Sequence, residues 1–468
     1  MRRPPLVEQA VLLGSLLKWL VLSTLAGAVA GLGAGVFLRA LQYSVDYMSG
    51  IDPAWRLIFL PFLGGLSGWI VWRFAPQAAG HGTEAVITAV HQRDGDIPFA
   101  VVPVKALATI ISLAGGGSAG KEGPCAQIGS GLASALARLL RLSPVDRRRL
   151  AICGIGAGFA AVFGTPLGGA VFGIEVLFGG ALLYDALFPS VVAGFTAYQV
   201  SQWFHVHYLR PSVPPVVGTG ELVFLKALLL GAFLGLVALA LIEALETAER
   251  LFRRVLVPPP LRPVLGGIVL VLLALVAGTG YLGMGAETVE RALSGVPVAP
   301  AAFIWKLVFT AVTLGSGWSG GVMLPIFFIG AAAGSVAAPL VGVDRAAGAA
   351  MGLSALLAGA TNAPIASSII AVEMFGPQVG VYAAAACLAS FLISGHRSVY
   401  PSQVLVMSKT SALRIPLRRP AGEVEHQVRL SAGLLRWIAR WRRSVRHARR
   451  PRFRHGAQGP GASHGSAS

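Results

Sequence analysis

Long apolar stretches dominate this chain and follow one another almost without interruption. They lie near residues 19–40, 57–74, 99–115, 150–180, 186–200, 222–242, 264–282, 301–315, 322–342, 346–360 and 364–394. A helix of about 20 apolar residues crosses the hydrocarbon core of a bilayer, which is about 30 Å thick, so several stretches fit single spans. The sequence therefore predicts an all-α polytopic membrane protein.

The composition excludes the other broad classes. Only 12% of the 468 residues are charged and 55% are hydrophobic, whereas soluble domains carry about 25% charged residues and disordered chains lack apolar ones. Three cysteines without paired spacing do not form a disulfide scaffold. The formal net charge of +18 needs no nucleic acid as partner, because basic residues accumulate on the cytoplasmic loops of membrane proteins.

The basic residues predict the orientation of the chain. They concentrate at the N-terminus, at 141–149 and in the segment from 411 onward. We therefore expect a multi-pass protein of the inner or plasma membrane with both termini in the cytoplasm, residues 1–14 forming the N-terminus and 411–468 a basic tail. Apolar residues recur at helical spacing among the arginines of this tail, which predicts an amphipathic surface helix at about 430–447, followed by a disordered end.

The chain contains an internal repeat. Residues 103–124 match 303–325 at an offset of 201 (306 − 105), which pairs Lys105 with Lys306 and Gly120 with Gly321. Residues 166–176 match 364–374 at an offset of 198 (373 − 175), which pairs Glu175 with Glu373. We predict two homologous membrane halves, 15–210 and 215–405. Repeats of this kind are often inverted in the membrane and place a substrate site at the midplane.

Glycine and proline interrupt several apolar stretches, as in Gly115–Pro124, Gly154–Pro166 and Gly315–Pro325. Irregular backbone at membrane depth is tolerated where protein buries it or where it lines a cavity, so these segments predict discontinuous helices. The free N–H groups at a helix start favour anions. No cluster of carboxylates that would suit a cation lies nearby, and neither a metal site nor a cofactor is expected. The predicted substrate is an anion.

Four motifs resemble those of the CLC family of chloride channels and transporters. They are Gly120–Pro124 (GKEGP), Gly321–Pro325 (GVMLP), Gly80–Glu84 (GHGTE) and Tyr400 after the last apolar stretch. The resemblance covers about residues 15–408 and implies two inverted repeats of short, tilted and broken helices. It also implies a homodimer in the bilayer with one pathway in each subunit and bound chloride as the only ligand. The family's large C-terminal nucleotide-sensing domains are not expected here.

The resemblance also assigns roles to residues. Glu122 would be the gating glutamate, and Glu175 and Lys105 would belong to the inner vestibule, where we expect Lys105 to pair with an acid such as Glu175. The residues expected to bind the anion are His81, Gly82, Gly120, Lys121, Gly123, Val322, Met323 and Tyr400.

The chain departs from the family pattern at positions that bear on mechanism. His81 stands where a chloride-binding serine is usual, and it either coordinates the anion, senses pH or turns aside. Glu84 replaces a proline and is expected to cap its helix. Val176 stands where proton-coupled members usually carry an internal acid, which favours a passive gated chloride channel.

Two other functions within transport stay open. The first is a proton-coupled chloride antiporter that uses a non-standard internal proton path. The second, more remote, is an exporter of fluoride or another anion. The fluoride-exporting branch of the family resembles this chain less, because this chain has Pro124 and His81 at two motif positions where that branch typically has other residues. An enzyme is not expected, since the apolar core contains no HExxH motif and no cluster of His and Cys.

Overall fold

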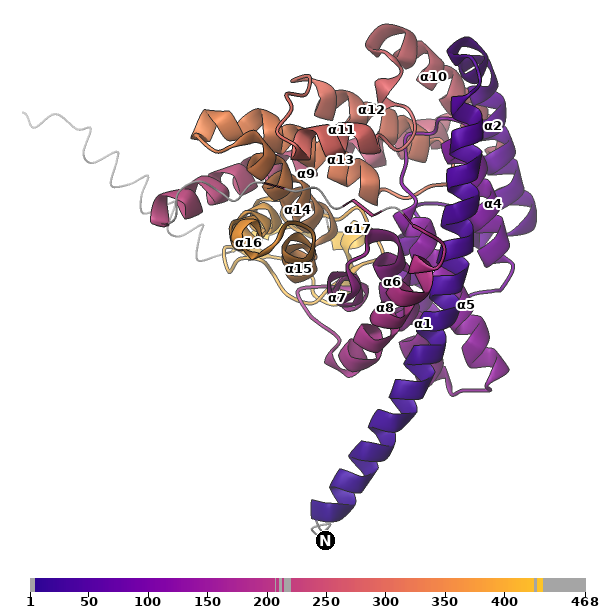
Figure 1. Cartoon of the computed structure of the whole chain (residues 1–468), viewed down its shortest axis with the longest axis vertical. Helices are drawn as coiled ribbons and strands as arrows, with labels where there is room; N and C mark the ends of the chain where they lie inside the picture. The colour runs from indigo at the N-terminus through magenta and orange to yellow at the C-terminus, as the bar shows by residue number, and fades with distance from the viewer. Residues whose placement is uncertain (1–4, 207, 210–212, 214–219, 425–426, 432–468) are drawn as a thin grey trace, which may run out of the picture.

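The computed structural model describes residues 5–206, 208–209, 213, 220–424 and 427–431, most of them in helices (Figure 1). Residues 1–4 and the predicted disordered end lie outside the described residues. The predicted amphipathic helix at about 430–447 also lies outside them, apart from its first two residues, 430 and 431.

The first half of the chain forms eight α-helices and two short 3-10 helices. They are α1 (Pro5–Ser49), α2 (Pro53–Phe74), η1 (Pro76–Ala78), α3 (Thr83–Gln92), α4 (Val101–Ala114), α5 (Glu122–Leu139), α6 (Pro144–Phe163), α7 (Pro166–Glu175), η2 (Tyr184–Ala186) and α8 (Leu187–Gln202).

The second half repeats this pattern. Its helices are α9 (Glu221–Arg254), η3 (Pro259–Leu261), α10 (Arg262–Ala277), η4 (Thr279–Tyr281), α11 (Ala286–Leu293), α12 (Ala302–Gly315), α13 (Met323–Ala337), η5 (Ala338–Val341), α14 (Arg345–Thr361), α15 (Pro364–Phe375) and α16 (Pro377–Ile393).

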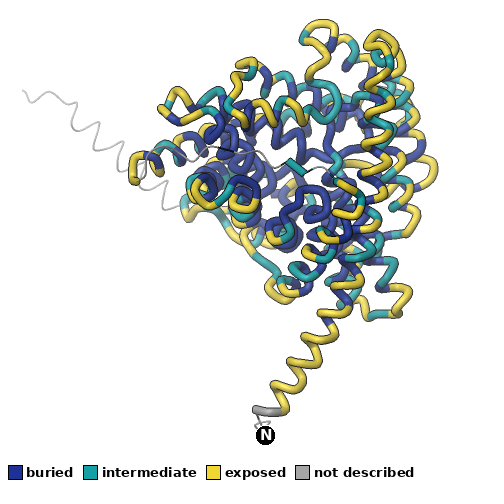
Figure 2. Tube along the Cα trace, in the orientation of Figure 1, coloured by how far each residue is buried: buried dark blue, intermediate teal, exposed yellow. Residues whose placement is uncertain are grey.

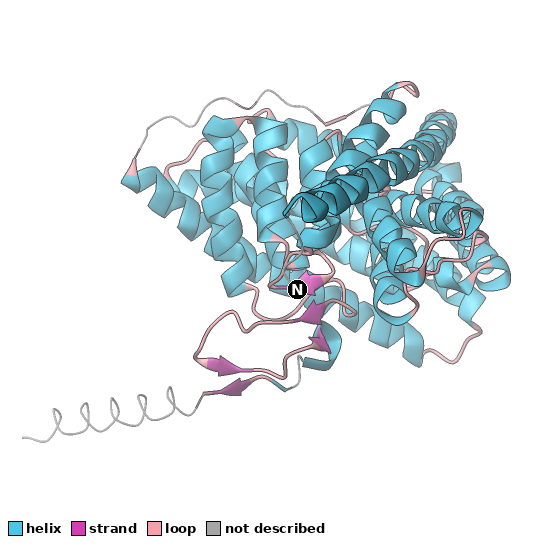
Figure 3. Ribbon diagram, turned by 90° about the horizontal axis from the view of Figure 1, so that it is seen from below, coloured by secondary structure: helices cyan, strands magenta, loops and turns pink. Residues whose placement is uncertain are grey.

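Short strands fasten the segment that follows α16 to the bundle (Figure 3). In one sheet, β2 (Val404–Leu405) is the middle strand. It runs parallel to β1 (Phe178–Gly179) and antiparallel to β4 (Arg419–Pro420). In the other, β3 (Leu413–Arg414) pairs with β5 (Arg429–Leu430), and the short helix α17 (Ala421–Val424) follows β4.

Local sequence signals set several helix boundaries. Ser143 caps α6 by accepting from the Asp146 amide, and Asp344 caps α14 by accepting from two amides. Gly164 and Asn362 end α6 and α14 in the left-handed conformation, which glycine and asparagine adopt at low cost. Proline begins the next helix in both cases, at Pro166 and Pro364. The apolar stretches 150–180 and 364–394 are thus interrupted helices.

One predicted break lies elsewhere. Gly154 and Gly158 belong to the continuous helix α6, and the interruption is confined to Gly164 and Thr165. These two helical glycines allow close packing instead. A Cβ atom on Gly158 would lie 2.4 Å from the carbonyl oxygen of Cys125 on α5, and one on Gly154 would lie 2.5 Å from the Ser130 Cα. These two glycines therefore serve close contact between α5 and α6 and do not interrupt the helix.

Helix α1 is much longer than a bilayer is thick. Its 45 residues extend about 67 Å at 1.5 Å per residue, and its N-terminal end projects beyond the other helices as an exposed rod (Figures 1 and 2). Residues 5–14, expected to precede the first membrane helix, are part of it. In the described residues, five helical segments are long and apolar enough to cross a membrane. Figure 2 shows the buried residues gathered at the centre of the molecule.

The two halves meet in a reciprocal backbone contact. The amide of Gly120 donates to the carbonyl of Gly321, and the amide of Gly321 donates to the carbonyl of Gly120, both at 2.7 Å. An exchange of this kind between equivalent residues requires an approximate two-fold axis through the contact. The backbone therefore runs in opposite directions at these two equivalent positions, as the predicted inverted repeats require.

Side chains obey the same symmetry. Ser118 bonds Thr310 at 3.1 Å, and Thr109 bonds Ser319 at 3.0 Å, so that each half supplies one hydroxyl of each type. Lys105 donates to the carbonyls of Ala78 and Gly80, and Lys306 to those of Tyr281 and Gly283. The paired positions found in the sequence are thus paired in space.

Candidate functional site

The N-terminal ends of α5 and α13 meet at the centre of the molecule. Glu122 is the first residue of α5 and is 1% exposed. Its Oε2 accepts a hydrogen bond of 3.2 Å from the amide of Leu324, the second residue of α13. The first amides of a helix lack partners within it and carry its positive end. A carboxylate thus occupies a position suited to an anion.

Glycines allow the surrounding backbone to approach this carboxylate. A Cβ atom on Gly120 would lie 2.3 Å from the Glu122 Oε2 atom, and one on Gly123 would lie 2.1 Å from the His81 carbonyl oxygen. Gly82 precedes α3 with φ of +82° and would bring a Cβ atom within 2.4 Å of the Gly123 carbonyl oxygen. Larger residues would separate the starts of α3 and α5.

Several buried polar atoms near this junction have no hydrogen-bond partner among the described residues. They include Nδ1 of His81, Oγ1 of Thr83, Oε2 of Glu84 and the hydroxyl of Tyr400. Tyr400 is fully buried and follows α16. Leaving a polar group buried and unpaired costs about 1–3 kcal/mol, so these groups are suited to bind water or a polar ligand. The hydroxyls and the imidazole can all donate to an anion.

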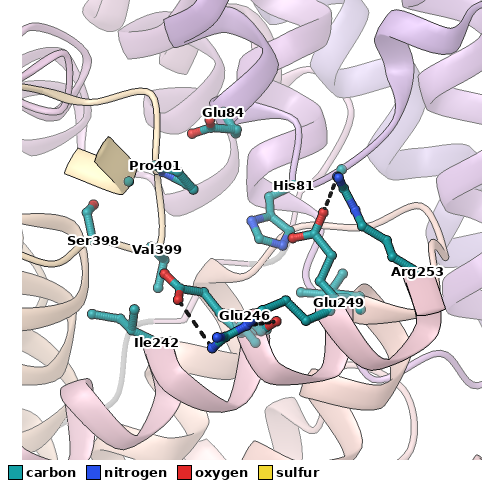
Figure 4. Close-up of a pocket in the computed structure, with 15 residues that line it drawn as sticks. His81, Glu84, Ile242, Glu246, Glu249, Arg253, Ser398, Val399 and Pro401 are labelled. Carbon is teal, nitrogen blue, oxygen red and sulfur yellow. Dashed lines mark hydrogen bonds and ion pairs between the residues drawn. The ribbon is translucent and has the colours of Figure 1, made fainter. Parts of the chain in front are cut away.

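Two cavities approach this junction. The first, called here the Glu122 cavity, has a volume of about 310 Å³ and is lined by Lys121, Glu122, Leu324 and part of α11. The second, the His81 cavity, has a volume of about 510 Å³ and is lined by His81, Glu84 and the last turns of α9 (Figure 4). Glu122 and His81 thus each line a separate cavity beside this junction.

The structure brings most of the predicted site residues together. Gly120, Glu122 and Gly123 surround the start of α5, while Val322 and Met323 begin α13 with both side chains buried. Lys121 also belongs to the start of α5. His81 and Gly82 contact this group through their backbone.

The predicted pair of Lys105 and Glu175 is wrong. Lys105 donates to the carbonyls of Ala78 and Gly80, at 3.1 and 2.7 Å. Glu175 accepts from the amides of Ile365 and Ala366 at the start of α15, at 3.1 and 2.7 Å. Each charge is satisfied by unpaired backbone groups, so neither needs the other. Neither side chain lines the two cavities.

Sequence reasoning missed the charged end of α9. Glu246, Glu249, Arg250 and Arg253 line the His81 cavity. Glu249 forms an ion pair of 2.6 Å with Arg253, and Glu246 one of 3.7 Å with Arg250. These charges recur at helical spacing directly after the apolar stretch 222–242 and belong to the same helix. That spacing was the available signal.

Comparisons of the sequence identify its relatives. Residues 63–395 match the family described as voltage gated chloride channel. A protein of Pseudomonas syringae pv. tomato described as chloride/fluoride channel protein is 36% identical over 418 residues, covering 87% of this chain and 90% of the relative. The voltage-gated ClC-type chloride channel ClcB of Escherichia coli O17:K52:H18 is 30% identical, covering 77% and 85%.

Solved structures show the same fold. A CLC-type fluoride/proton antiporter superposes with a TM-score of 0.79 at 30% identity, covering 83% of this chain and 98% of that one. A slow cyanobacterial Cl⁻/H⁺ antiporter superposes with a TM-score of 0.71 at 20% identity, covering 82% and 96%, and supports the fold alone.

These findings correct one expectation. Proteins named for fluoride are at least as similar to this chain as those named for chloride alone, although Pro124 and His81 led us to expect less similarity. Two motif positions were a poor measure because similarity accumulates over the whole chain. With a match across most of its membrane region and relatives at 30% identity or more, this chain belongs to the voltage-gated chloride channel family, the CLC proteins, which transport anions across membranes.

Proposed function

We propose that this protein exchanges a halide, chloride or fluoride, for protons across the membrane. The observation that carries the proposal is the Glu122 carboxylate at the start of α13, where it accepts the Leu324 amide. The relatives support exchange, because the solved structure at 30% identity is a fluoride/proton antiporter. A passive channel, which Val176 led us to favour, has less support.

The position of Glu122 gives the carboxylate two competing states. When ionised, it is attracted to the amides of α13, and interactions of this type contribute about 0.3–2 kcal/mol. When protonated, it loses that attraction and leaves the amides free for an anion. A halide and the ionised carboxylate thus exclude each other, and each anion that enters requires a proton on Glu122. This competition couples the two ions.

The halide would lie against the amides of Val322, Met323 and Leu324 and accept from the hydroxyl of Tyr400. The Tyr400 hydroxyl has no hydrogen-bond partner among the described residues, and the Leu324 amide becomes available when the Glu122 carboxylate leaves it. The side chain of Met323 plays no part in this binding, because amides hold the ion. Lys121 lines the Glu122 cavity and offers a positive charge to anions that approach from that side.

The proposal includes the orientation and assembly of the chain. The His81 cavity opens to the cytoplasm and the Glu122 cavity to the outside. Lys18 on α1 pairs with Asp146 at 2.7 Å, so the N-terminal part of α1 lies beside the basic segment 141–149, which supports one cytoplasmic side for both. The functional unit is a homodimer with one pathway in each subunit, which mass photometry of the purified protein tests.

The function is tested with purified protein in liposomes. An outward gradient of chloride or fluoride is imposed, and halide and proton movements are recorded separately. We expect protons to move uphill, driven by the halide, in the wild type. In Glu122→Gln we expect the halide to move without protons, because the amide cannot ionise.

Glu287→Gln serves as the control, since Glu287 is an exposed acid in the first turn of α11. It should behave as the wild type does. Halide movement without any proton movement in the wild type would instead establish a passive channel. The two halide gradients, compared at equal concentration, decide between chloride and fluoride.

A further inference from the structure

The segment 166–176 provides no acid for a proton path. Val176 is fully buried and apolar. Both carboxylate oxygens of Glu175 are held by the amides of Ile365 and Ala366. A proton that travels between Glu122 and the opposite cavity must therefore use other groups.

The His81 cavity supplies such groups. Figure 4 shows the Glu249 carboxylate on α9 turned towards the imidazole of His81, with Glu84 further along the same wall. The Glu249 side chain is 51% exposed and reaches solvent. Nδ1 of His81 is buried and has no partner in the described part of the chain. A solvent-accessible acid thus stands beside an imidazole that is available for proton transfer.

Charged side chains from three helices surround Glu249 and His81. Arg250, Arg253 and Glu246 extend from α9, Glu84 from α3, and Lys105 reaches the Gly80 carbonyl from α4. Arg253 pairs with Glu249, but exposed ion pairs of this kind are weak. Glu249 can therefore leave Arg253 and approach His81 at little cost.

Polar groups continue from His81 towards Glu122. One oxygen of Glu84 accepts from the amide and hydroxyl of Ser402, whereas its Oε2 has no partner among the described atoms. The Tyr400 hydroxyl lies within electrostatic range of both Glu84 and Glu122 and close to Thr83. Carboxylates, hydroxyls and an imidazole can each accept and release a proton.

We propose that Glu249 and His81 form the proton entrance of this transporter and deliver protons from the His81 cavity towards Glu122. This inference rests on the proposed exchange of halide for protons. Residues at the end of α9 and beside the start of α3 would thus take up protons in this chain, where position 176 carries no acid.

The transfer conserves charge and changes no bond between heavy atoms. The Glu249 carboxylate takes a proton from solvent and passes it to one ring nitrogen of His81. The imidazolium releases the proton of its other nitrogen towards the hydroxyls of Thr83 and Tyr400. Glu122 receives a proton at the end of this series, and Glu249 is again ionised. Both residues position and relay the proton, and neither reacts with the halide in this step.

The experiment measures the ratio of protons to halide ions moved in liposomes that contain the full-length protein. Glu249→Gln and His81→Gln are compared with the wild type over a range of pH on the His81-cavity side. Loss of a positioned proton-transfer group should lower proton flux about tenfold or more, and halide flux should fall less. Glu249→Asp should restore the ratio. The double variant should add little to either single one, because both residues act on one path.

Glu423→Gln is the matched control. Glu423 also pairs with an arginine four residues away, Arg419, and is exposed, but it does not line the His81 cavity. Its ratio should equal that of the wild type. A wild-type ratio in both Glu249→Gln and His81→Gln would overturn the entrance and leave the exchange proposal intact. Equal loss of both fluxes in Glu249→Gln, without rescue by aspartate, would show a structural role and also overturn it. A wild type that moves no protons would overturn both proposals.

Discussion

The hydroxyl of Tyr400 is the residue-scale feature that most directly indicates a bound ion. The side chain is fully buried, and its hydroxyl lacks a hydrogen-bond partner among the described residues. A phenolic hydroxyl in such a place is a net cost to stability unless a ligand satisfies it. Replacing it should therefore affect ligand binding far more than folding.

We expect Tyr400→Phe to weaken halide binding about 10- to 100-fold, since a hydrogen bond to a charged group contributes about 1.5–3 kcal/mol. The thermal unfolding midpoint without halide should change far less, because the contact with Thr83 is the only close side-chain interaction of the hydroxyl at stake among the described residues. Titration calorimetry of the purified protein measures the first quantity. Tyr184→Phe, at a side chain that is 75% exposed, is the control. Unchanged halide affinity in Tyr400→Phe would remove Tyr400 from the binding site.

At the scale of elements, helix starts receive carboxylates from the opposite repeat. Glu175 at the end of α7 binds the first amides of α15, and Glu373 on α15 binds those of Leu167 and Gly168 on α7. Each acid both ends its own repeat motif and caps the partner motif. The equal spacing of the two glutamates was visible in the sequence, but their exchange across the repeats was not.

We expect Glu175→Gln and Glu373→Gln to lower the free energy of unfolding by similar amounts, about 1–3 kcal/mol each, because an amide can accept from only one of the two N–H groups. Tryptophan fluorescence during thermal unfolding measures the effect. Glu221→Gln, at an exposed acid in the first turn of α9, should change little. A loss of proton coupling without loss of stability in Glu175→Gln would instead make Glu175 a proton carrier.

Close contact between α5 and α6 also belongs to this scale. We expect Gly158→Ala to destabilise the protein by about 1–3 kcal/mol through overpacking, because its Cβ atom would lie 2.4 Å from the Cys125 carbonyl oxygen. Gly14→Ala on α1 meets no atom within 4 Å and should be neutral or slightly stabilising. The thermal unfolding midpoints of the two variants test this expectation. Equal midpoints would contradict a close contact between Gly158 and the Cys125 carbonyl.

At the scale of the whole molecule, the two-fold relation at Gly120 and Gly321 fixes which surfaces share a side of the membrane. Lys226 near the start of α9 donates to the Gly342 carbonyl directly after η5. Lys18 on α1 pairs with Asp146 near the start of α6, which follows α5. The start of α9 therefore lies beside η5, and the end of α9 lies on the other side together with the end of α5. The three native cysteines are buried, so they provide a silent background for labelling.

We expect Leu139→Cys and Leu256→Cys to react with a membrane-impermeant maleimide only from the cytoplasm, and Leu340→Cys only from outside. All three side chains are highly exposed, at 79%, 102% and 86%. Labelling of intact cells and of inverted vesicles gives the measurement. Reaction of all three cysteines from one side would contradict the inverted arrangement.

Much of the fold and part of the site could be predicted from the sequence. The internal repeat predicted that Lys105 is equivalent to Lys306 and Glu175 to Glu373, because the two halves share the same spacing along the chain. The glycine-rich motifs located Glu122 at a helix start. The partner of Lys105 could not be predicted, since backbone carbonyls at the ends of other helices carry no signature in the sequence.

The sequence by itself determined the membrane class, the two homologous halves and the glycine-rich helix starts, because hydrophobic length, glycine and proline act locally. Only the tertiary structure decided which charges meet. It placed the Glu122 carboxylate on the Leu324 amide and brought Glu249 beside His81. These contacts join residues far apart in the chain, and they depend on how the two halves pack around their common axis.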